Sequence, residues 1–290
     1  MNPFQPSGTV APADFFGRKQ ELQQAEAFIR SSTEGMPVFF SVNGPMGTGT
    51  SSFLRKIESA ATCAKARMSA ANCHSLQDFL RLLETMLTLA KTPLQLKADQ
   101  FGAAAIAQLQ DTKPVLLCID DAQHLSCILP FCSRLQESRA KVCMAFANLP
   151  GLMPALDLQP FTRQEAQLLI EQRLAGSDCS AEQEAIASIA ALAIPQRIQE
   201  TCFHLCSADG RITTAAMKAY AQLRASSIML GRIEQQVYDA MPDGEFTPTQ
   251  LSKRLNKQLP WLAPKLRSLL AKGVITKKAR GLYEKGGALG

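Results

Sequence analysis

Apolar positions along the first half of the chain follow two patterns. In the first, apolar residues recur every three or four positions, as at Leu22, Ala25 and Phe28, which predicts an amphipathic helix. In the second, they form a nearly continuous run, which predicts a strand buried on both faces. The predicted helices are 19–31, 51–62, 76–91 and 96–109, and the predicted strands are 38–42, 114–119 and 141–147. Alternation of such strands with helices predicts a parallel sheet covered by helices on both faces.

The second half of the chain has a different pattern. Residues 162–220 are almost wholly helical in spacing, with no strand-like run and with Pro195 as a break near the middle. The last segment predicts helices at 231–241, 249–256 and 262–272, then two short strands at 274–277 and 281–284. That order is typical of a winged helix-turn-helix, in which Thr247 or Thr249 caps the second helix. The predicted domains are an N-terminal arm (1–14), an α/β core (15–160), a helical lid (161–226) and a winged helix-turn-helix domain (227–290).

A glycine-rich loop joins the first predicted strand to the following helix. The loop is Gly44-Pro45-Met46-Gly47-Thr48-Gly49-Thr50-Ser51. Glycines allow backbone N–H groups to approach phosphate oxygens closely, and the start of a helix adds positive potential. Gly44 and Gly49 have the spacing of a phosphate-binding G-x-x-x-x-G-K-[ST] loop, in which Ser51 takes the position of the hydroxyl that binds Mg²⁺. The alternative is a glycine turn with a purely structural role.

Thr50 stands where such loops carry a lysine. That lysine contacts the β- and γ-phosphates and offsets the charge that develops during phosphoryl transfer. A neutral hydroxyl removes a large electrostatic contribution to catalysis. We therefore expect ATP binding with Mg²⁺, and weak or absent hydrolysis.

Two aspartates end the predicted strand at 114–119. Asp120 and Asp121 follow the glycine loop by about 70 residues. This is the usual arrangement of a site in which one carboxylate binds Mg²⁺ and the next polarises water. A carboxylate pair at the end of a strand can also cap the next turn. Both interpretations remain open at this stage.

Positive charge is concentrated at the end of the chain. From Phe246 onward there are ten Lys or Arg residues against Glu284 alone, a net charge of +9, so the rest carries −3 of the total of +6. This asymmetry favours contact with a polyanion, and we expect weakly specific binding to double-stranded DNA. The candidate DNA contacts are Lys265, Arg267 and Lys272 on the third predicted helix, and Lys277, Lys278 and Arg280 in the strand pair. A solvated basic surface is the alternative.

The remaining composition favours an intracellular protein. The nine cysteines stand singly among apolar residues, which favours free thiols over disulfides. A helix with a plain core role is favoured over a zinc site for Cys202, His204 and Cys206. The chain has no run of 18 uncharged apolar residues and no secretory signal pattern, so we expect a cytoplasmic protein without a membrane partner.

Together these motifs resemble the AAA+ and related P-loop ATPases, in the branch that contains the origin-recognition ATPases. The segment from Phe16-Gly17-Arg18 to Leu22 is similar to the family's F-x-G-R-x-x-E-L motif beside the adenine. The loop is similar to G-x-x-G-T-G-K-S-S. The resemblance implies nucleotide contacts from Phe16, Gly17, Gly44, Pro45, Met46, Gly47, Thr48, Gly49, Thr50, Ser51 and Ser52.

The resemblance also implies roles for residues outside the loop. Asp120 is the Mg²⁺ partner, with Ser51, and Asp121 stands where the family more often has a catalytic Glu. Asn148 is similar to the first sensor of the γ-phosphate region, and Arg197, in Ile194-Pro195-Gln196-Arg197, to the second sensor.

The implied fold is a P-loop NTPase sheet with a helical lid and a C-terminal winged helix. The implied role is a nucleotide-dependent switch or assembly factor on DNA in replication, helicase loading or transposition, with a homo-oligomer or a partner ATPase left open. Two alternatives are a signalling or defence switch whose winged helix docks protein, and a scaffold that binds no nucleotide.

Overall fold

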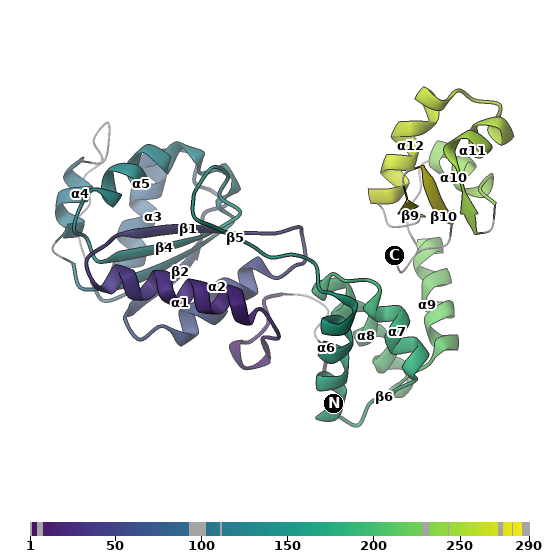
Figure 1. Ribbon diagram of the computed structural model, residues 1–290, viewed down its shortest axis with the longest axis horizontal. Coiled ribbons are helices and arrows are strands. Elements are labelled where there is room, and N and C mark those ends of the chain that lie inside the picture. The colour runs from purple at the N-terminus through teal and green to yellow at the C-terminus, as the bar shows by residue number, and fades with distance from the viewer. Residues whose placement is uncertain are drawn as a thin grey trace. The chain divides into compact units, whose positions relative to one another are not determined.

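The computed structural model describes residues 2–4, 8–92, 103–110, 112–227, 232–242, 244–271, 275–279 and 281–285 (Figure 1). The chain divides into two compact units. One is Ser7–Pro160, and the other is Met1–Pro6 with Phe161–Gly290. No helix in these described ranges is both long enough and apolar enough to cross a membrane.

The first unit is built on a five-stranded parallel sheet with the strand order β2-β3-β4-β1-β5. Its strands are β1 (Val38–Asn43), β2 (Ala64–Ser69), β3 (Val115–Asp120), β4 (Val142–Ala147) and β5 (Ala155–Asp157). Its helices are α1 (Lys19–Thr33), α2 (Thr50–Ala60), α3 (Leu76–Leu89), α4 (Ala103–Gln110) and α5 (Leu129–Gln136), with short 3₁₀ turns at Pro12–Asp14, Ala122–His124 and Ser126–Ile128. This architecture confirms the predicted α/β class.

Helices cover both faces of this sheet (Figure 1). Because side chains alternate along a strand, neighbours such as Phe39 and Phe40 enter different cores. Phe39 lies in the core formed with α3 and α5, whereas Phe40 lies in the core formed with α1 and α2. Both rings are fully buried. The central strands are therefore apolar on both faces, which is the reason for their nearly continuous hydrophobic runs.

Two strands of the sheet were not predicted from the sequence. The edge strand β2 buries Ala66 and leaves its other residues at least partly exposed, so it has no continuous apolar run. The opposite edge strand, β5, is only three residues long. Both strands are defined by pairing with a neighbour rather than by their own hydrophobicity.

The second unit begins with four helices, α6 (Arg163–Ala175), α7 (Gln183–Ala190), α8 (Pro195–Asp209) and α9 (Thr214–Ser227). Thr162 and Glu165 form a capping box at the start of α6. The segment is almost wholly helical, as predicted. The expectation that it contains no strand is wrong, because β6 (Ser180–Ala181) and β7 (Arg211–Ile212) pair as short parallel strands. Two residues are too few to produce a strand pattern in the sequence.

The last described elements are three helices and a three-stranded sheet. They are α10 (Arg232–Asp239), β8 (Glu245–Phe246), α11 (Pro248–Leu255), α12 (Leu259–Ala271), β9 (Ile275–Ala279) and β10 (Leu282–Lys285), with the strand order β8-β10-β9. Their core includes Phe246, Leu251, Leu262 and Leu269. Thr247 caps α11 in a capping box with Gln250. Helix α12 begins three residues before its predicted start, and it contains Pro264.

The described N-terminal residues are anchored to folded parts of the chain. Asn2 donates a hydrogen bond from Nδ2 to the Phe203 carbonyl at 2.8 Å, and the Phe4 side chain is buried. In the other unit, the Val10 N–H donates to Ser52 Oγ at 3.1 Å. The predicted arm is therefore held at both of its described parts.

Candidate functional site

The glycine loop between β1 and α2 requires glycine for steric reasons. A Cβ atom at Gly44 would lie 2.3 Å from Thr48 Oγ1 and 2.9 Å from the Leu158 carbonyl oxygen. Gly47 and Gly49 have φ angles of 86° and 97°, a region that side chains disfavour. The Thr48 hydroxyl donates to the Pro45 carbonyl at 2.7 Å and closes the loop on itself.

Helix α2 begins directly after the loop, at Thr50. Gly49 is its N-cap residue, and no side chain of the described residues caps this end by a hydrogen bond. The backbone N–H groups of a first helical turn have no partner inside the helix, and the helix dipole makes that end positive. Met46 projects from the loop and is 93% exposed. The loop and the start of α2 therefore have the properties of an anion-binding site.

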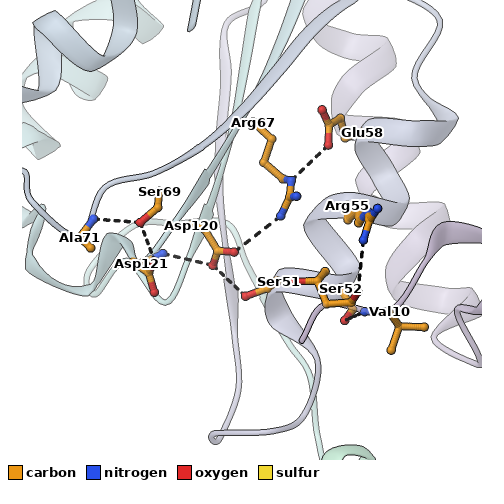
Figure 2. A network of polar contacts seen from close by, with 11 residues as sticks. Val10, Ser51, Ser52, Arg55, Glu58, Arg67, Ser69, Ala71, Asp120 and Asp121 are labelled. Carbon is orange, nitrogen blue, oxygen red and sulfur yellow. Dashed lines mark hydrogen bonds and ion pairs between the residues drawn. The ribbon is translucent and has the colours of Figure 1, made fainter. Parts of the chain in front are cut away.

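Asp120, the last residue of β3, faces Ser51 of α2. Ser51 Oγ donates to Asp120 Oδ1 at 2.9 Å, and the Asp121 N–H donates to the same oxygen at 3.1 Å (Figure 2). The other carboxylate oxygen, Oδ2, lies 3.9 Å from Arg67 Nη1. The structure thus brings together the two residues that the sequence assigned to a metal.

Asp121 has a different environment from Asp120. Its backbone is left-handed, with a φ of 54°, and Ser69 Oγ on β2 donates to Asp121 Oδ2 at 2.6 Å. Ser69 Oγ in turn accepts the Ala71 N–H at 3.2 Å (Figure 2). The carboxylate that was assigned to water activation is engaged with the edge strand.

Asn148 lies at the end of β4, beside β1. Its Oδ1 accepts the Gly44 N–H at 3.1 Å, and its own N–H donates to the Val42 carbonyl at 2.9 Å. The φ of 57° turns the chain sharply out of the strand. The predicted first sensor therefore contacts the first residue of the glycine loop.

The basic residues that follow the loop bind the N-terminal segment. Arg55 Nη1 donates to the Thr9 carbonyl at 3.2 Å, and Lys56 Nζ donates to the Pro12 carbonyl at 2.9 Å. These contacts hold both side chains at the N-terminal segment. The sequence pattern did not identify the N-terminal segment as their partner.

Arg67 on β2 was not identified from the sequence. Lys65, Arg67 and Ser69 alternate with residues of the opposite face, where Ala66 is buried against α3. Arg67 therefore lies on the α2 face of the sheet, where its Nε is 3.3 Å from Glu58 Oε2. The sequence carries a weak signal for this face, since Lys65 and Arg67 alternate with the uncharged residues Ala64, Ala66 and Met68.

The segment before α1 contains the residues assigned to the adenine. Gly17 and Arg18 both have positive φ angles, of 70° and 60°. The buried Arg18 donates from Nη2 to the Gln159 carbonyl and lies 3.5 Å from Glu21. The nucleotide contacts of Phe16 and Gly17 stay predictions.

Several other predicted residues belong to the second unit. Arg197 lies in the first turn of α8, and its sensor role stays a prediction. Arg267, Lys277 and Lys278 are exposed and Lys265 is half-buried, whereas Lys272 and Arg280 lie outside the described residues. Lys278 Nζ is 2.7 Å from Glu284 Oε2, and this hydrogen bond raises the pKa of Lys278.

The described cysteines are free thiols. Burial raises the pKa of Cys132 to about 12 and that of Cys118 well above its ordinary value. Cys202 and Cys206 are buried in α8, and burial raises the pKa of both. The described part of the chain contains no group of three or more metal-binding side chains.

The oxygen pair of Ser51 and Asp120 fits Mg²⁺. This ion prefers oxygen ligands and in nucleotide sites takes one or two protein ligands beside phosphates and several waters. The distance of 2.9 Å between Ser51 Oγ and Asp120 Oδ1 brings a hydroxyl and a carboxylate together beside the start of α2. The donor set and its position are those of a metal that accompanies a bound phosphate chain.

The architecture is similar to those of solved ATPases. A Walker-type ATPase of Pyrococcus abyssi superposes with a TM-score of 0.61 at 13% identity, covering 99% of this chain and 98% of that chain. RuvB of Thermotoga maritima, a Holliday junction branch migration motor, gives 0.51 at 14% identity, covering 95% and 94%. The chain has the fold of the AAA+ P-loop ATPases. The predicted P-loop fold is therefore confirmed, although the sequence matches no known protein family and no curated protein.

Proposed function

We propose that the chain binds ATP with Mg²⁺ at the glycine loop and uses the nucleotide to control its conformation or assembly on DNA. The observation that carries this proposal is the hydrogen bond of 2.9 Å from Ser51 to Asp120 at the uncapped start of α2. It joins a phosphate-binding helix end to the carboxylate of the neighbouring strand, as an Mg²⁺-nucleotide site requires.

Each part of the site has a separate task in binding. Backbone N–H groups from Gly47 to Ser52 bind the phosphates, and Ser51 with Asp120 holds the metal. Bound Mg²⁺ would neutralise part of the phosphate charge. Asn148 keeps the start of the loop in place through its bond to the Gly44 N–H.

Hydrolysis is slow in this proposal. Thr50 brings no positive charge to the β- and γ-phosphates. The hydrogen bond from Ser69 engages the Asp121 carboxylate, which competes with any role in orienting water. The state of the protein then depends on whether nucleotide is bound, rather than on rapid hydrolysis.

The action on DNA rests on the C-terminal charge. The segment from Phe246 onward has a net charge of +9. Its helices α11 and α12 and its β9–β10 pair, with α10 before them, are the elements of a winged helix. RuvB, with the same fold, is a motor of Holliday junction branch migration. We infer double-stranded DNA as the partner of this segment, bound through phosphate contacts.

A titration with a fluorescent ATP analogue tests the nucleotide site. We expect the chain to bind the analogue, and Mg²⁺ to strengthen the binding. Asp120→Asn should weaken binding in Mg²⁺ by about tenfold, since it removes the metal-binding charge but keeps the side-chain shape. Glu137→Gln, an exposed carboxylate of the same unit, is the matched control and should bind as the unsubstituted chain does. No binding by the unsubstituted chain would contradict the proposal.

A further inference from the structure

Arg67 lies between two carboxylates, one on α2 and one at the end of β3. Its Nη1 is 3.9 Å from Asp120 Oδ2, and its Nε is 3.3 Å from Glu58 Oε2 on α2 (Figure 2). The Arg67 side chain is 29% exposed. Partial burial weakens the screening of its charge by solvent and salt, and a guanidinium remains protonated at any physiological pH.

Among the described residues, Arg67 is the cation that lies within 4 Å of the Asp120 carboxylate. Asp120, Asp121 and Glu58 are all acidic, and Thr50 leaves the loop itself uncharged. Three other cations of this region keep their charges, but backbone carbonyls hold them and no ion pair joins them to Asp120. Arg55 and Lys56 bind backbone carbonyls of the N-terminal segment, and Lys65 Nζ donates to the Ala61 carbonyl at 2.8 Å. Without Arg67, the Asp120 carboxylate would have no cation within 4 Å among the described residues when a phosphate chain approaches the loop.

We propose that Arg67 is a positioning residue that supplies, from β2, the positive charge that the loop lacks at Thr50. Its contact is with Oδ2, whereas Oδ1 of Asp120 accepts the Ser51 hydroxyl, and these two oxygens would hold Mg²⁺. Its charge also reduces the repulsion between Asp120 and the phosphates. This inference rests on the proposed nucleotide binding.

Substitutions at Arg67 distinguish the effect of its charge on nucleotide affinity from the effect of its shape. Arg67→Gln should weaken binding of the fluorescent ATP analogue in Mg²⁺ by about tenfold, whereas Arg67→Lys should stay within about threefold because it keeps the charge. Lys65→Gln is the matched control, since it removes a cation from the same face of β2 without a contact to Asp120, and it should leave the affinity unchanged. Thermal unfolding without nucleotide checks that each variant is folded.

A double-mutant cycle of Arg67→Gln with Thr50→Lys tests whether a lysine at position 50 can replace the charge of Arg67. If Arg67 supplies the charge that position 50 lacks, Thr50→Lys should strengthen binding by a factor about five times larger in the Arg67→Gln chain than in the unsubstituted chain. Equal factors in the two backgrounds would overturn the inference, because a purely structural Arg67 would not couple to position 50. Equal losses for Arg67→Lys and Arg67→Gln would also overturn it.

Failure of this inference differs from failure of the proposed function. If the unsubstituted chain and Arg67→Gln bind nucleotide equally well, the nucleotide site stands and the role of Arg67 is wrong. If the unsubstituted chain binds no nucleotide, with or without Mg²⁺, both are wrong.

Discussion

Gly44 shows how a single residue determines the shape of the loop. Thr48 Oγ1 lies where the Cβ of any other residue would be, and that hydroxyl holds the Pro45 carbonyl at 2.7 Å. The Leu158 carbonyl closes the other side at 2.9 Å, and a backbone atom moves less easily than the end of a side chain. The N–H of the same glycine is bound by Asn148. Displacement of Gly44 would therefore affect both the loop and the candidate sensor.

Gly44→Ala should weaken nucleotide binding by about tenfold or more, because the added methyl group forces the loop away from the geometry in which its N–H groups converge. Overpacking should also lower the free energy of unfolding by about 1–3 kcal/mol. Nucleotide titration and chemical unfolding measure the two effects. Gly176→Ala is the control, since nothing lies within 4 Å of the added Cβ and its φ is not positive. Equal affinities for the two variants would contradict this account of the loop.

The sequence predicted part of this site at the residue scale. Ser51 and Asp120 were identified from glycine spacing and the end of an apolar strand, and Asn148 from the family resemblance. The structure brings them to the carboxyl ends of the central strands. Arg67 was missed for a physical reason. Its position beside Asp120 depends on the register of β2 against β3, in which Arg67 pairs with Cys118, and one chain's hydrophobic pattern does not contain that register.

At the scale of elements, the strands with the most buried residues were the ones that the sequence predicted. The strands β1, β3 and β4 are buried almost throughout, and their apolar runs identified them. The edge strands β2 and β5 have few buried residues, so their formation depends on the neighbouring strand. Pairs as short as β6 and β7 need only two residues each and produce no pattern.

Glu182 joins two elements of the helical region. Its Oε2 accepts the Thr214 N–H at 2.9 Å and the Thr214 hydroxyl at 3.1 Å at the start of α9, and Arg211 lies 3.9 Å from Oε1. These bonds, led by that of the backbone N–H, lower the pKa of Glu182 below its ordinary value of 4.5. A carboxylate with a lowered pKa stabilises the fold above its unfolded-state pKa, and this stabilisation is lost as the pH falls through the folded-state pKa.

Glu182→Gln should therefore lower the thermal midpoint at pH 7, and the difference from the unsubstituted chain should shrink as the pH falls below about 4.5. The effect should be small, because the Glu182 side chain is 40% exposed and its charge is screened by solvent. Thermal unfolding by circular dichroism across this pH range measures it. Glu184→Gln, an exposed carboxylate two residues along the chain, is the control. A difference that persists unchanged into acid would show that shape, rather than charge, is responsible.

At the scale of the whole molecule, charge separates the C-terminal segment from the rest. Each protein cation that neutralises a DNA phosphate contributes about −0.9 to the slope of log affinity against log salt concentration. Lys277 on β9 is exposed, whereas Lys278 is paired with Glu284. Lys277→Gln should weaken binding to duplex DNA of any sequence and reduce the magnitude of the slope by about 1. Fluorescence anisotropy over a range of salt concentrations measures both.

The matched control for this substitution is Lys141→Gln, which removes an exposed cation from the first unit. It should leave the slope unchanged. The absence of DNA binding by the unsubstituted chain at low salt would contradict the DNA proposal and favour a protein partner for the C-terminal segment.

A nucleotide-dependent switch also requires that its two ligands affect each other. If ATP changes the affinity for DNA by some factor, DNA must change the affinity for ATP by the same factor, because the two effects are one coupling free energy. We expect each ligand to change the affinity for the other by a factor of about five or more, which is the usual range of coupling between two sites. Titration of DNA with and without saturating ATP, and of the ATP analogue with and without saturating DNA, gives both factors. In the Asp120→Asn chain, ATP at concentrations too low to occupy the weakened site should no longer change the affinity for DNA. The affinity of this variant for DNA without ATP should equal that of the unsubstituted chain. A DNA affinity that ignores ATP in the unsubstituted chain would mean that the two sites act independently, and the switch would be excluded even if each site binds its ligand.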